Sequence, residues 1–472
     1  FISDKTNWYT TNIYGSKIWD REKLNHFWAM IKIHKILKND FEFDGFVFPT
    51  FYKNPLLLNT DAIYFFEIFG AAGLDIQKKI RFVNCTFLGP FLFNNFEHTT
   101  NVALNRNINL KNDLTFIRCN FLDEFRLVSV NINESLAIHE CTFNNEVLIE
   151  DSKILNQLSI HKCVFNKKTI FWRNQIKRTN FIKNTFNELS QLLSSTYTNS
   201  FSLDSCTFNN KAEFNNNIYN KAFSIHSTKF NDAVFFQKED FKNGNFSDVT
   251  FSNKHSYIKE ITLTGSRYLK LKSNYFPSNF SFIKSNCTNI LFMESSIEHL
   301  KFDSCSWNIT DRLLIKDEMD LKNLNTSNYL KLENIYRQLK KNFDVQKDWE
   351  LSGNAYISEM EMRKERLFLE KKYFSFFIYW FYGVFGGYTQ NFLKPIKSLI
   401  TLIIICTTAY FFIDLNVINS LERGINGSIP YMEIREVEPY PSYWLLLKNV
   451  QLILSGIFIS FFILGLRKRF KQ

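Results

Sequence analysis

The strongest constraint on the fold is a column of phenylalanines that recurs through the middle of the chain. Successive members are 21 or 22 residues apart, and they are Phe121, Phe143, Phe165, Phe186, Phe208, Phe230 and Phe251. A small or short residue lies two positions before each of them. One residue type that returns at a fixed step indicates repeats that stack on their neighbours. The pattern therefore predicts a repetitive scaffold whose core contains these seven rings.

Within one repeat, large apolar residues follow each other at steps of five or six positions, as in Ile138, Phe143, Leu148, Ile154 and Ile160. An α-helix needs a period of 3.6 and a flat strand a period of 2. A step of five instead fits a coil with four short sides, in which equivalent positions stack at the ~4.8 Å spacing of neighbouring strands. The predicted fold class is a β-solenoid of roughly ten coils over about residues 80–310.

Short segments of this region resemble the pentapeptide-repeat family. Cys141–Asn145 and Cys206–Asn210 both read CTFNN, Thr228–Asp232 reads TKFND, and Phe41–Pro49 resembles the first coil of phenylalanine-rich members. In that family a small residue and a Leu or Phe two positions later both point inward. The resemblance implies a right-handed quadrilateral β-helix over about half of the chain. It implies little about function, because one scaffold serves many roles.

Two uncharged apolar runs near the C-terminus, Ile396–Ile413 (apart from Lys397) and Val450–Leu466, predict two transmembrane helices. Each run is just long enough to span a bilayer. The alternative is a pair of buried core helices. Against it, neither run has a polar face, aromatic residues crowd Phe374–Tyr388, and the basic segment Arg467–Lys471 follows the second run directly. Aromatic belts and basic ends of this kind are typical of membrane interfaces.

The charges around the two runs predict their orientation. Lys394, Lys397 and the basic end flank the runs, whereas the stretch 414–442 between them has five acidic residues and two arginines. The positive-inside rule places both termini and the repeat domain in the cytoplasm, with the acidic loop outside. We expect a multi-pass protein of a bacterial inner membrane. The formal net charge of +11 suits an anionic lipid surface.

The same features divide the chain into five parts. Residues 1–79 form an N-terminal cap with a helix over Arg21–Lys38, and residues 80–310 form the solenoid. A helical connector over 311–372, an aromatic interfacial segment over 373–395 and the two-helix transmembrane domain over 396–472 follow. The segments Glu333–Lys341 and Glu359–Arg363 resemble the connector of membrane-bound pentapeptide-repeat proteins whose C-terminus is ion-channel-like. That resemblance implies a pore domain.

Two narrow stripes of polar residues begin just before the second apolar run and continue along it. Lys448, Gln451 and Ser455 share one helical side, and Asn449, Gly456 and Ser460 form the neighbouring stripe. Polar groups at membrane depth face water or a bundle interior, which makes these residues candidates for a pore lining. The alternative is that both stripes pack helices together and Lys448 reaches the interface. A potassium-selective filter is disfavoured, since Gly424–Pro430 reads as a turn.

Other chemistry finds little support in the sequence. Five cysteines, Cys85, Cys119, Cys141, Cys163 and Cys206, lie in the inward small-residue column, where packing explains them. A zinc site built from His139, Cys141, His161 and Cys163 is disfavoured, because the histidines and cysteines should point in opposite directions. The acidic residues Glu359 and Glu361 are expected to be solvated. We therefore expect no catalytic residue, no metal and no cofactor.

The leading functional hypothesis is an oligomeric pore or membrane-perturbing effector that is gated through the cytoplasmic rod, with a role in bacterial stress or phage defence. Two helices cannot enclose a pore, so this hypothesis requires a homo-oligomer. The alternative is a non-conducting scaffold that is anchored in membrane lipid and binds a partner protein. A nucleic-acid partner is disfavoured, because the charges of the repeat region are mixed and form no basic block.

Overall fold

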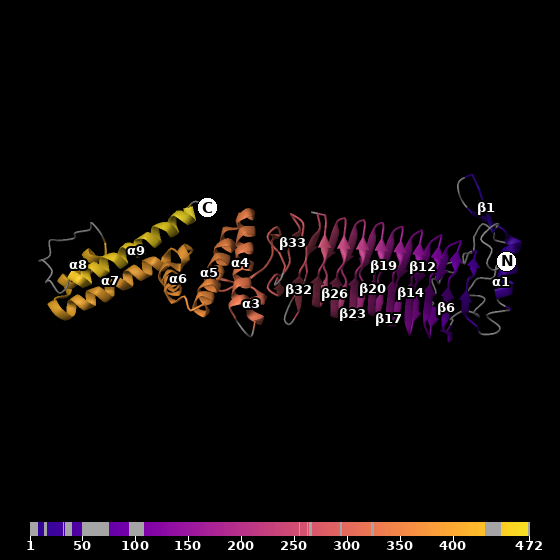
Figure 1. Cartoon of the computed structure of the whole chain (residues 1–472), viewed down its shortest axis with the longest axis horizontal. Helices are drawn as coiled ribbons and strands as arrows, with labels where there is room; N and C mark the ends of the chain where they lie inside the picture. The colour runs from indigo at the N-terminus through magenta and orange to yellow at the C-terminus, as the bar shows by residue number, and fades with distance from the viewer. Residues whose placement is uncertain are drawn as a thin grey trace, which may run out of the picture. The chain divides into compact units, whose positions relative to one another are not determined.

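The chain forms two structural units, Phe1–Trp307 and Asn308–Gln472. The structure is a computed structural model (Figure 1), and it describes residues 8–13, 17–31, 33, 40–49, 75–93, 108–253, 255–261, 263, 267–292, 295–321, 325–429 and 445–470. The first unit is a parallel stacked-coil β-solenoid of about nine turns, which confirms the predicted fold class. The second unit is helical and contains both candidate membrane spans.

Each coil of the solenoid contributes strands to three parallel sheets, in which strands of successive coils are neighbours (Figure 1). The first sheet contains β3 (Glu42–Asp44), β6 (Ile80–Val83), β10 (Leu114–Ile117), β14 (Ser135–His139), β17 (Lys153–His161), β20 (Gln175–Ile182), β23 (Thr196–Asp204), β26 (Ile218–His226), β29 (Asp240–Ser247), β32 (Tyr268–Lys272) and β34 (Ile290–Leu291), with β5 (Asp75–Ile76), β9 (Ile108–Leu110) and β13 (Val130–Ile132) joined to it.

The second sheet is narrow and contains β4 (Val47–Phe48), β7 (Thr86–Phe87), β11 (Asn120–Phe121), β15 (Thr142–Phe143), β18 (Val164–Phe165), β21 (Thr185–Phe186), β24 (Thr207–Phe208), β27 (Lys229–Phe230) and β30 (Thr250–Phe251). The third contains β8 (Phe91–Phe93), β12 (Phe125–Val128), β16 (Val147–Glu150), β19 (Thr169–Trp172), β22 (Ser190–Leu193), β25 (Ala212–Asn215), β28 (Val234–Gln237), β31 (Tyr257–Lys259), β33 (Ser281–Ile283) and β35 (Lys301–Asp303). Parallel pairing in constant register brings equivalent residues of successive coils together.

The phenylalanine column runs through the interior of the second sheet. All seven predicted rings are at most 3% exposed. Register pairs Phe121 with Phe143 and Phe143 with Phe165, so consecutive rings stack nearly parallel, with centroids 4.7 and 4.9 Å apart. Each ring is thus covered by the rings of the coils before and after it, and the solenoid has a continuous aromatic stack in its interior.

Twice in each coil the chain turns a corner at a residue with left-handed (positive φ) backbone conformation, as at Glu140, Asp151, Lys162 and Arg173. The residue after each corner turns inward. One set is the predicted column with Cys141, and a second set, which the sequence did not reveal, is Ser152, Asn174, Ser195, Asn217 and Glu239. Their side chains accept hydrogen bonds from backbone N–H groups of the previous coil, for example Asn174 Oδ1 from Ser152 at 3.0 Å. This ladder satisfies backbone donors that the corners remove from the sheets.

The N-terminal part of the first unit covers the end of the core. The strands β1 (Tyr9–Thr11) and β2 (Lys17–Trp19) form an antiparallel pair, and α1 (Arg21–Ile31) follows. Phe27 and Trp28 of α1 are buried and contact the ring of Phe48, which starts the phenylalanine column. Such a cap shields apolar surface and open strand edges. The predicted end of this helix, residues 34–38, lies outside the described residues.

The second unit begins with the antiparallel strands β36 (Asn308–Ile309) and β37 (Leu313–Leu314). Its helices are α3 (Lys316–Asp320), α4 (Thr326–Gln346), α5 (Trp349–Leu369), α6 (Tyr373–Gly386), the 3-10 helix η3 (Gly387–Thr389), α7 (Leu393–Asp414), α8 (Val417–Ser428) and α9 (Leu445–Phe470). The helices α4 and α5 form a hairpin, since Lys347 adopts the left-handed conformation and Asp348 caps α5 through the N–H of Leu351.

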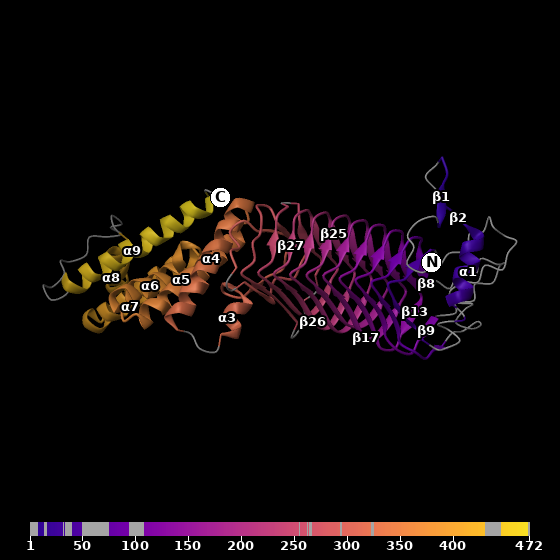
Figure 2. The ribbon, with the colours of Figure 1, turned by 45° about the vertical axis from the view of Figure 1, so that its right-hand side comes forward.

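The helices α7 and α9 contain the two candidate spans, Leu393–Phe412 and Leu445–Lys468, and they pack against each other (Figure 2). Their mean hydropathies are 1.7 and 2.0, yet the spans are 17% and 22% buried. A pair of soluble core helices would bury most of such apolar surface, so the exposure favours a lipid environment over the core-helix alternative.

The segment between the two spans differs from the expected loop. The sequence predicted a turn at Gly424–Pro430, but Val417–Ser428 forms the helix α8. Asn416 begins it by accepting hydrogen bonds from the backbone N–H groups of Ile418 and Asn419 at 3.0 and 3.3 Å. This cap satisfies donors in the first turn, and glycines at its other end are tolerated because they lie against neighbouring helices.

Candidate functional site

The candidate site predicted on the second span surrounds Gln451, which α7 and α8 cover almost completely. Its side chain is 1% exposed. Tyr410 of α7 donates a hydrogen bond to Gln451 Oε1 at 3.1 Å, and Gln451 Nε2 donates to Gly424 O at 2.7 Å and to Ser428 Oγ at 2.6 Å. The amide is therefore fully engaged within one chain, and its bonds hold the three helices together.

Two glycines of α8 allow the close approach that these bonds require. A Cβ at Gly424 would overlap Thr407 Oγ1 of α7, and a Cβ at Gly427 would lie 2.8 Å from Gln451 Oε1. Either contact is too short to keep, so the side chain of Thr407 or Gln451, or the helix itself, would have to move. Small residues at a helix–helix interface are typical of packing in lipid, where backbones come close enough for polar contacts.

The helix α8 exposes apolar side chains together with Asn419 and buries other polar ones. Val417, Ile418 and Leu421 are exposed, whereas Ser420 and Arg423 are buried against its neighbours. In water the apolar face would turn inward. An outward apolar face with polar groups inside is expected for a membrane-embedded bundle. The apolar residues at helical spacing after the Asn416 cap were the signal in the sequence that could have revealed α8.

The structure divides the two predicted polar stripes of α9. Ser455 is buried beside Gln451, and its hydroxyl donates to Leu452 O at 2.9 Å. Lys448 is half-buried, and Asn449 and Ser460 are exposed. No atom would lie within 4 Å of a Cβ at Gly456. Gln451 and Ser455 thus face the interior of one chain, and Asn449, Gly456 and Ser460 face outward; that any of them lines a pore stays a prediction.

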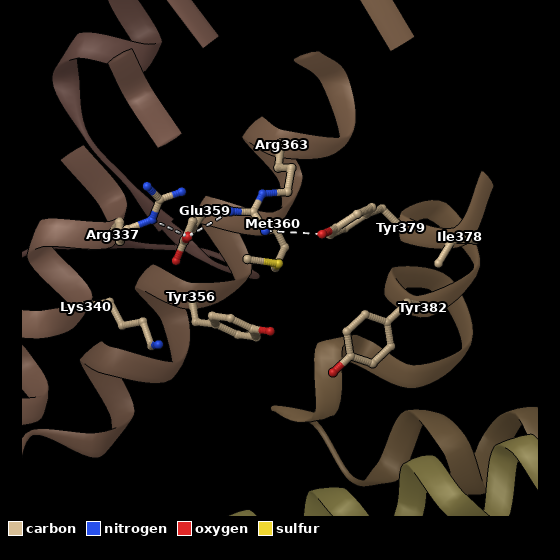
Figure 3. A pocket seen from close by; sticks show the side chains of 9 residues that line it. All are labelled: Arg337, Lys340, Tyr356, Glu359, Met360, Arg363, Ile378, Tyr379 and Tyr382. Atoms are coloured by element: carbon tan, nitrogen blue, oxygen red, sulfur yellow. Dashed lines mark hydrogen bonds and ion pairs between the residues drawn. The ribbon is translucent and has the colours of Figure 1, made fainter. Parts of the chain in front are cut away.

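A cavity of about 530 Å³ lies between α4, α5 and α6, in a part of the chain that the sequence did not mark as a site (Figure 3). Arg337 and Lys340 come from α4, and Tyr379 and Tyr382 come from α6. The helix α5 adds Tyr356, Glu359, Met360 and Arg363, and α6 also adds Ile378. The walls thus combine cationic groups and the carboxylate of Glu359 with phenol rings and two apolar side chains.

Three arginines converge on the buried carboxylate of Glu333, whose side chain is 2% exposed. Arg337 Nη2 lies 2.7 Å from Glu333 Oε1, and the Nε atoms of Arg363 and Arg366 each lie 3.0 Å from a carboxylate oxygen. Glu359 is also buried, 2.9 Å from Arg337. The expectation that Glu359 is solvated was therefore wrong, because the facing helix α4 supplies the cation that stabilises it.

The phenol ring of Tyr356 lies close to two ammonium groups. Lys340 Nζ is 5.0 Å from the ring centroid, and Lys468 Nζ of α9 is 4.7 Å from it. Such distances are within the range of cation–π attraction. Burial raises the pKa of Tyr356 to about 12, and the nearby phenol of Tyr382 contributes to the rise. Tyr356 therefore stays a neutral hydrogen-bond donor at physiological pH.

In the two His–Cys pairs that were considered as zinc ligands, both cysteines point inward, as predicted. The thiol of Cys141 is buried and donates to His139 O at 3.3 Å, and that of Cys163 is buried and donates to Ile138 O at 3.3 Å. The half-exposed rings of His139 and His161 contact each other on the outer side, 5.9 Å apart. Where the structure describes the chain, no cluster of three or more His, Cys, Asp or Glu could hold a metal.

Comparison of the chain with protein-family models, curated proteins and solved structures found no match. The class of protein is thus defined by its architecture: a β-solenoid protein with two candidate membrane-spanning helices. This architecture is compatible with a pentapeptide-repeat-like protein.

Proposed function

We propose that this protein is a membrane-anchored scaffold of the pentapeptide-repeat type, whose solenoid binds a partner protein. The observation that carries the proposal is the engagement of Gln451 by Tyr410, Gly424 and Ser428 of the same chain. The central polar group of the spans serves helix packing and has no free donor for water. A pore lining needs such groups on a surface that faces an aqueous path.

The rod suits a docking role because its surface repeats at every coil. An outer row of asparagines directly follows the stacked phenylalanines, and each side chain donates to the one in the previous coil, as in Asn166 to Asn144 at 3.0 Å and Asn187 to Asn166 at 2.8 Å. The row contains Asn144, Asn166, Asn187, Asn209 and Asn231, and Asn120, which precedes Phe121, accepts from Asn144 at its start. A rigid, periodic surface presents many equivalent contacts to an elongated protein partner.

The membrane topology belongs to the same proposal. We place α7 and α9 across a bacterial inner membrane with both termini in the cytoplasm, supported by Lys394, Lys397 and the basic C-terminal end. A reporter fused after Gln472 should be active in the cytoplasm, and Cys introduced at exposed Asn416 should react with an impermeant thiol reagent from outside. If the thiol does not react and the reporter is found outside the cytoplasm, the orientation is the opposite of the one proposed.

Ion flux tests the scaffold against the pore. The full-length protein reconstituted into liposomes should remain with the vesicles after alkaline washing and should release neither potassium nor chloride. The variant Gln451→Leu should lose helix-packing stability and remain equally impermeable. Flux from the wild-type protein that changes in Gln451→Leu without a change in stability would favour the pore.

An oligomeric pore is the second candidate, because Asn449 and Ser460 are polar and lie exposed on the outer side of α9. Several copies that turn this side toward a common axis would form a polar path. A ring of Lys448 near its mouth would favour anions, so Lys448→Glu should move the reversal potential in planar bilayers toward cation selectivity. An unchanged reversal potential, or no current, would exclude this lining. A role in stress or phage defence would follow the pore hypothesis and stays a prediction.

A further inference from the structure

We propose that the cavity between α4, α5 and α6 binds the phosphate group of an anionic phospholipid. The inference goes beyond the scaffold function, since it gives the connector a ligand of its own. It rests on three features of the cavity: an excess of positive charge, hydrogen-bond donors around an apolar floor, and a position beside the end of a candidate span.

The positive charge is only partly balanced by carboxylates, of which Asp344 attracts Lys468 and also accepts a hydrogen bond from Ser352. Glu359 and Glu333 are already held by arginines, and Arg337 and Arg363 each contact both of them. Lys340 and Lys468 form no ion pair with any residue that the structure describes. Both ammonium groups lie near the ring of Tyr356 and are therefore at most about 10 Å apart. An anion within reach of both ammonium groups would offset their mutual repulsion.

The remaining walls fit a phosphate ester better than a bare ion. The hydroxyl of Tyr379 accepts from Arg363 at 3.2 Å and keeps its own proton to donate. Tyr356 is a neutral phenol at the same wall. Met360 and Ile378 line the cavity with carbon and sulfur, which offers contact to the glycerol and first acyl carbons of a lipid. Inorganic phosphate would leave that apolar surface unused.

The position of the cavity favours a lipid over a soluble phosphate ester. Lys468 is the last residue of the candidate span on α9, so the cavity lies at the level where lipid headgroups begin. The helix α6 exposes Phe374, Phe377 and Trp380, as helices in the interfacial region do. Basic pockets beside transmembrane helices on the cytoplasmic side are suited to anionic headgroups.

The test is direct counting of bound lipid on the full-length protein in a neutral detergent by native mass spectrometry. The probes are phosphatidylglycerol, phosphatidylcholine and sn-glycerol 3-phosphate, each titrated separately. We expect one tight phosphatidylglycerol site with weaker binding of the other two. Lys340→Gln combined with Lys468→Gln should weaken phosphatidylglycerol binding by roughly tenfold or more, since each cation near a headgroup contributes about 1 kcal/mol.

Two controls keep the result interpretable. Lys331→Gln removes the same charge from an exposed position of α4 and should leave binding unchanged. The single variant Lys340→Gln should show an intermediate loss and provides the measurement if the double variant does not fold. Equal phosphatidylglycerol binding by wild type and Lys340→Gln would overturn the proposal. Glycerol phosphate binding as tight as that of the lipid would also overturn it, in favour of a soluble ligand; neither result bears on ion flux and thus on the scaffold.

Discussion

Glu239 Oε1 accepts hydrogen bonds from both the backbone N–H and the side-chain amide of Asn217, one coil earlier, at 3.4 and 3.2 Å. Glu239 is the ionisable member of the second inward column and is 1% exposed. None of the described residues forms an ion pair with it. Burial raises the pKa of its carboxyl from the ordinary 4.5 to about 8, although the bonds from Asn217 act in the opposite direction.

The solenoid should therefore lose stability as the pH rises from about 4.5 to about 8. Below this window Glu239 is protonated in both the folded and the unfolded chain. Within it the unfolded chain releases the proton first, which favours unfolding by up to about 1.4 kcal/mol per pH unit. Glu239→Gln keeps the acceptor and removes the charge, so it should raise the free energy of unfolding at pH 7 by roughly 3 kcal/mol.

Urea unfolding of the full-length protein in detergent, followed by circular dichroism of the β-structure at pH 5, 7 and 9, measures this effect. The matched control is Glu188→Gln, which changes an exposed carboxylate that pairs with Lys167. If the urea midpoint of the wild-type protein does not decrease more from pH 5 to pH 9 than that of Glu239→Gln, the raised pKa is contradicted.

Phe165→Ala should destabilise the middle of the solenoid by about 3–5 kcal/mol, because it removes a ring stacked between two others and leaves a cavity. The neighbouring centroids, those of Phe143 and Phe186, lie 4.9 and 4.7 Å away. The control is Leu155→Ala on β17, the strand that precedes β18 in the chain. Its side chain is 53% exposed, so the change should cost less than about 0.5 kcal/mol. Amide hydrogen exchange of β15, β18 and β21 measures both, and equal protection in the two variants would argue against a tightly packed column.

Gly424→Ala should separate α8 from α7, because the new Cβ would overlap Thr407 Oγ1. We expect a loss of about 1–3 kcal/mol and a lower unfolding temperature in detergent. Adding Thr407→Ala should recover part of the loss. Gly456→Ala is the control, as its Cβ meets no atom within 4 Å. If Gly456→Ala instead lowers the molecular mass of the particle, the outer side of α9 is an interface between copies of the chain.

Glu333→Gln should loosen the connector, because Arg337, Arg363 and Arg366 would lose the carboxylate that neutralises them. Removal of one partner from a buried ion cluster typically costs about 3–5 kcal/mol. Glu350→Gln, on the exposed side of α5, is the matched control. Faster proteolysis of the α4–α5 hairpin in Glu333→Gln than in the control is the expected result. Identical rates would mean that Glu359 and Glu370 hold the arginines without Glu333.

The repeat fold could be read from the sequence because its information is local and repeated. The step between Phe121, Phe143 and Phe165 equals one coil, and each coil meets only its neighbours. The second inward column escaped notice because its members, Ser152 and Asn174 among them, are chemically mixed. They share a place after a left-handed corner, and that place is defined by backbone conformation and by no residue type.

For the candidate site, periodicity alone determined that Gln451 and Ser455 share one side of α9. It could not determine what that side faces. The answer depends on α8, whose exposed apolar face and buried glycines make sense only beside two other helices. Glu359 illustrates the same limit: on its own helix it resembles a solvated residue, and the arginine that buries it comes from α4.

The sequence by itself therefore determined the solenoid, the two apolar helices and the helical connector, since each follows from the pattern of residues along one segment. Tertiary structure alone decided the bonds of Gln451 and the cavity beside Tyr356. Those sites combine Tyr410 with Gln451 and Lys340 with Lys468, side chains far apart in the chain. Their distance is set by the packing of whole helices, which depends on side-chain shape and on the surrounding solvent or lipid.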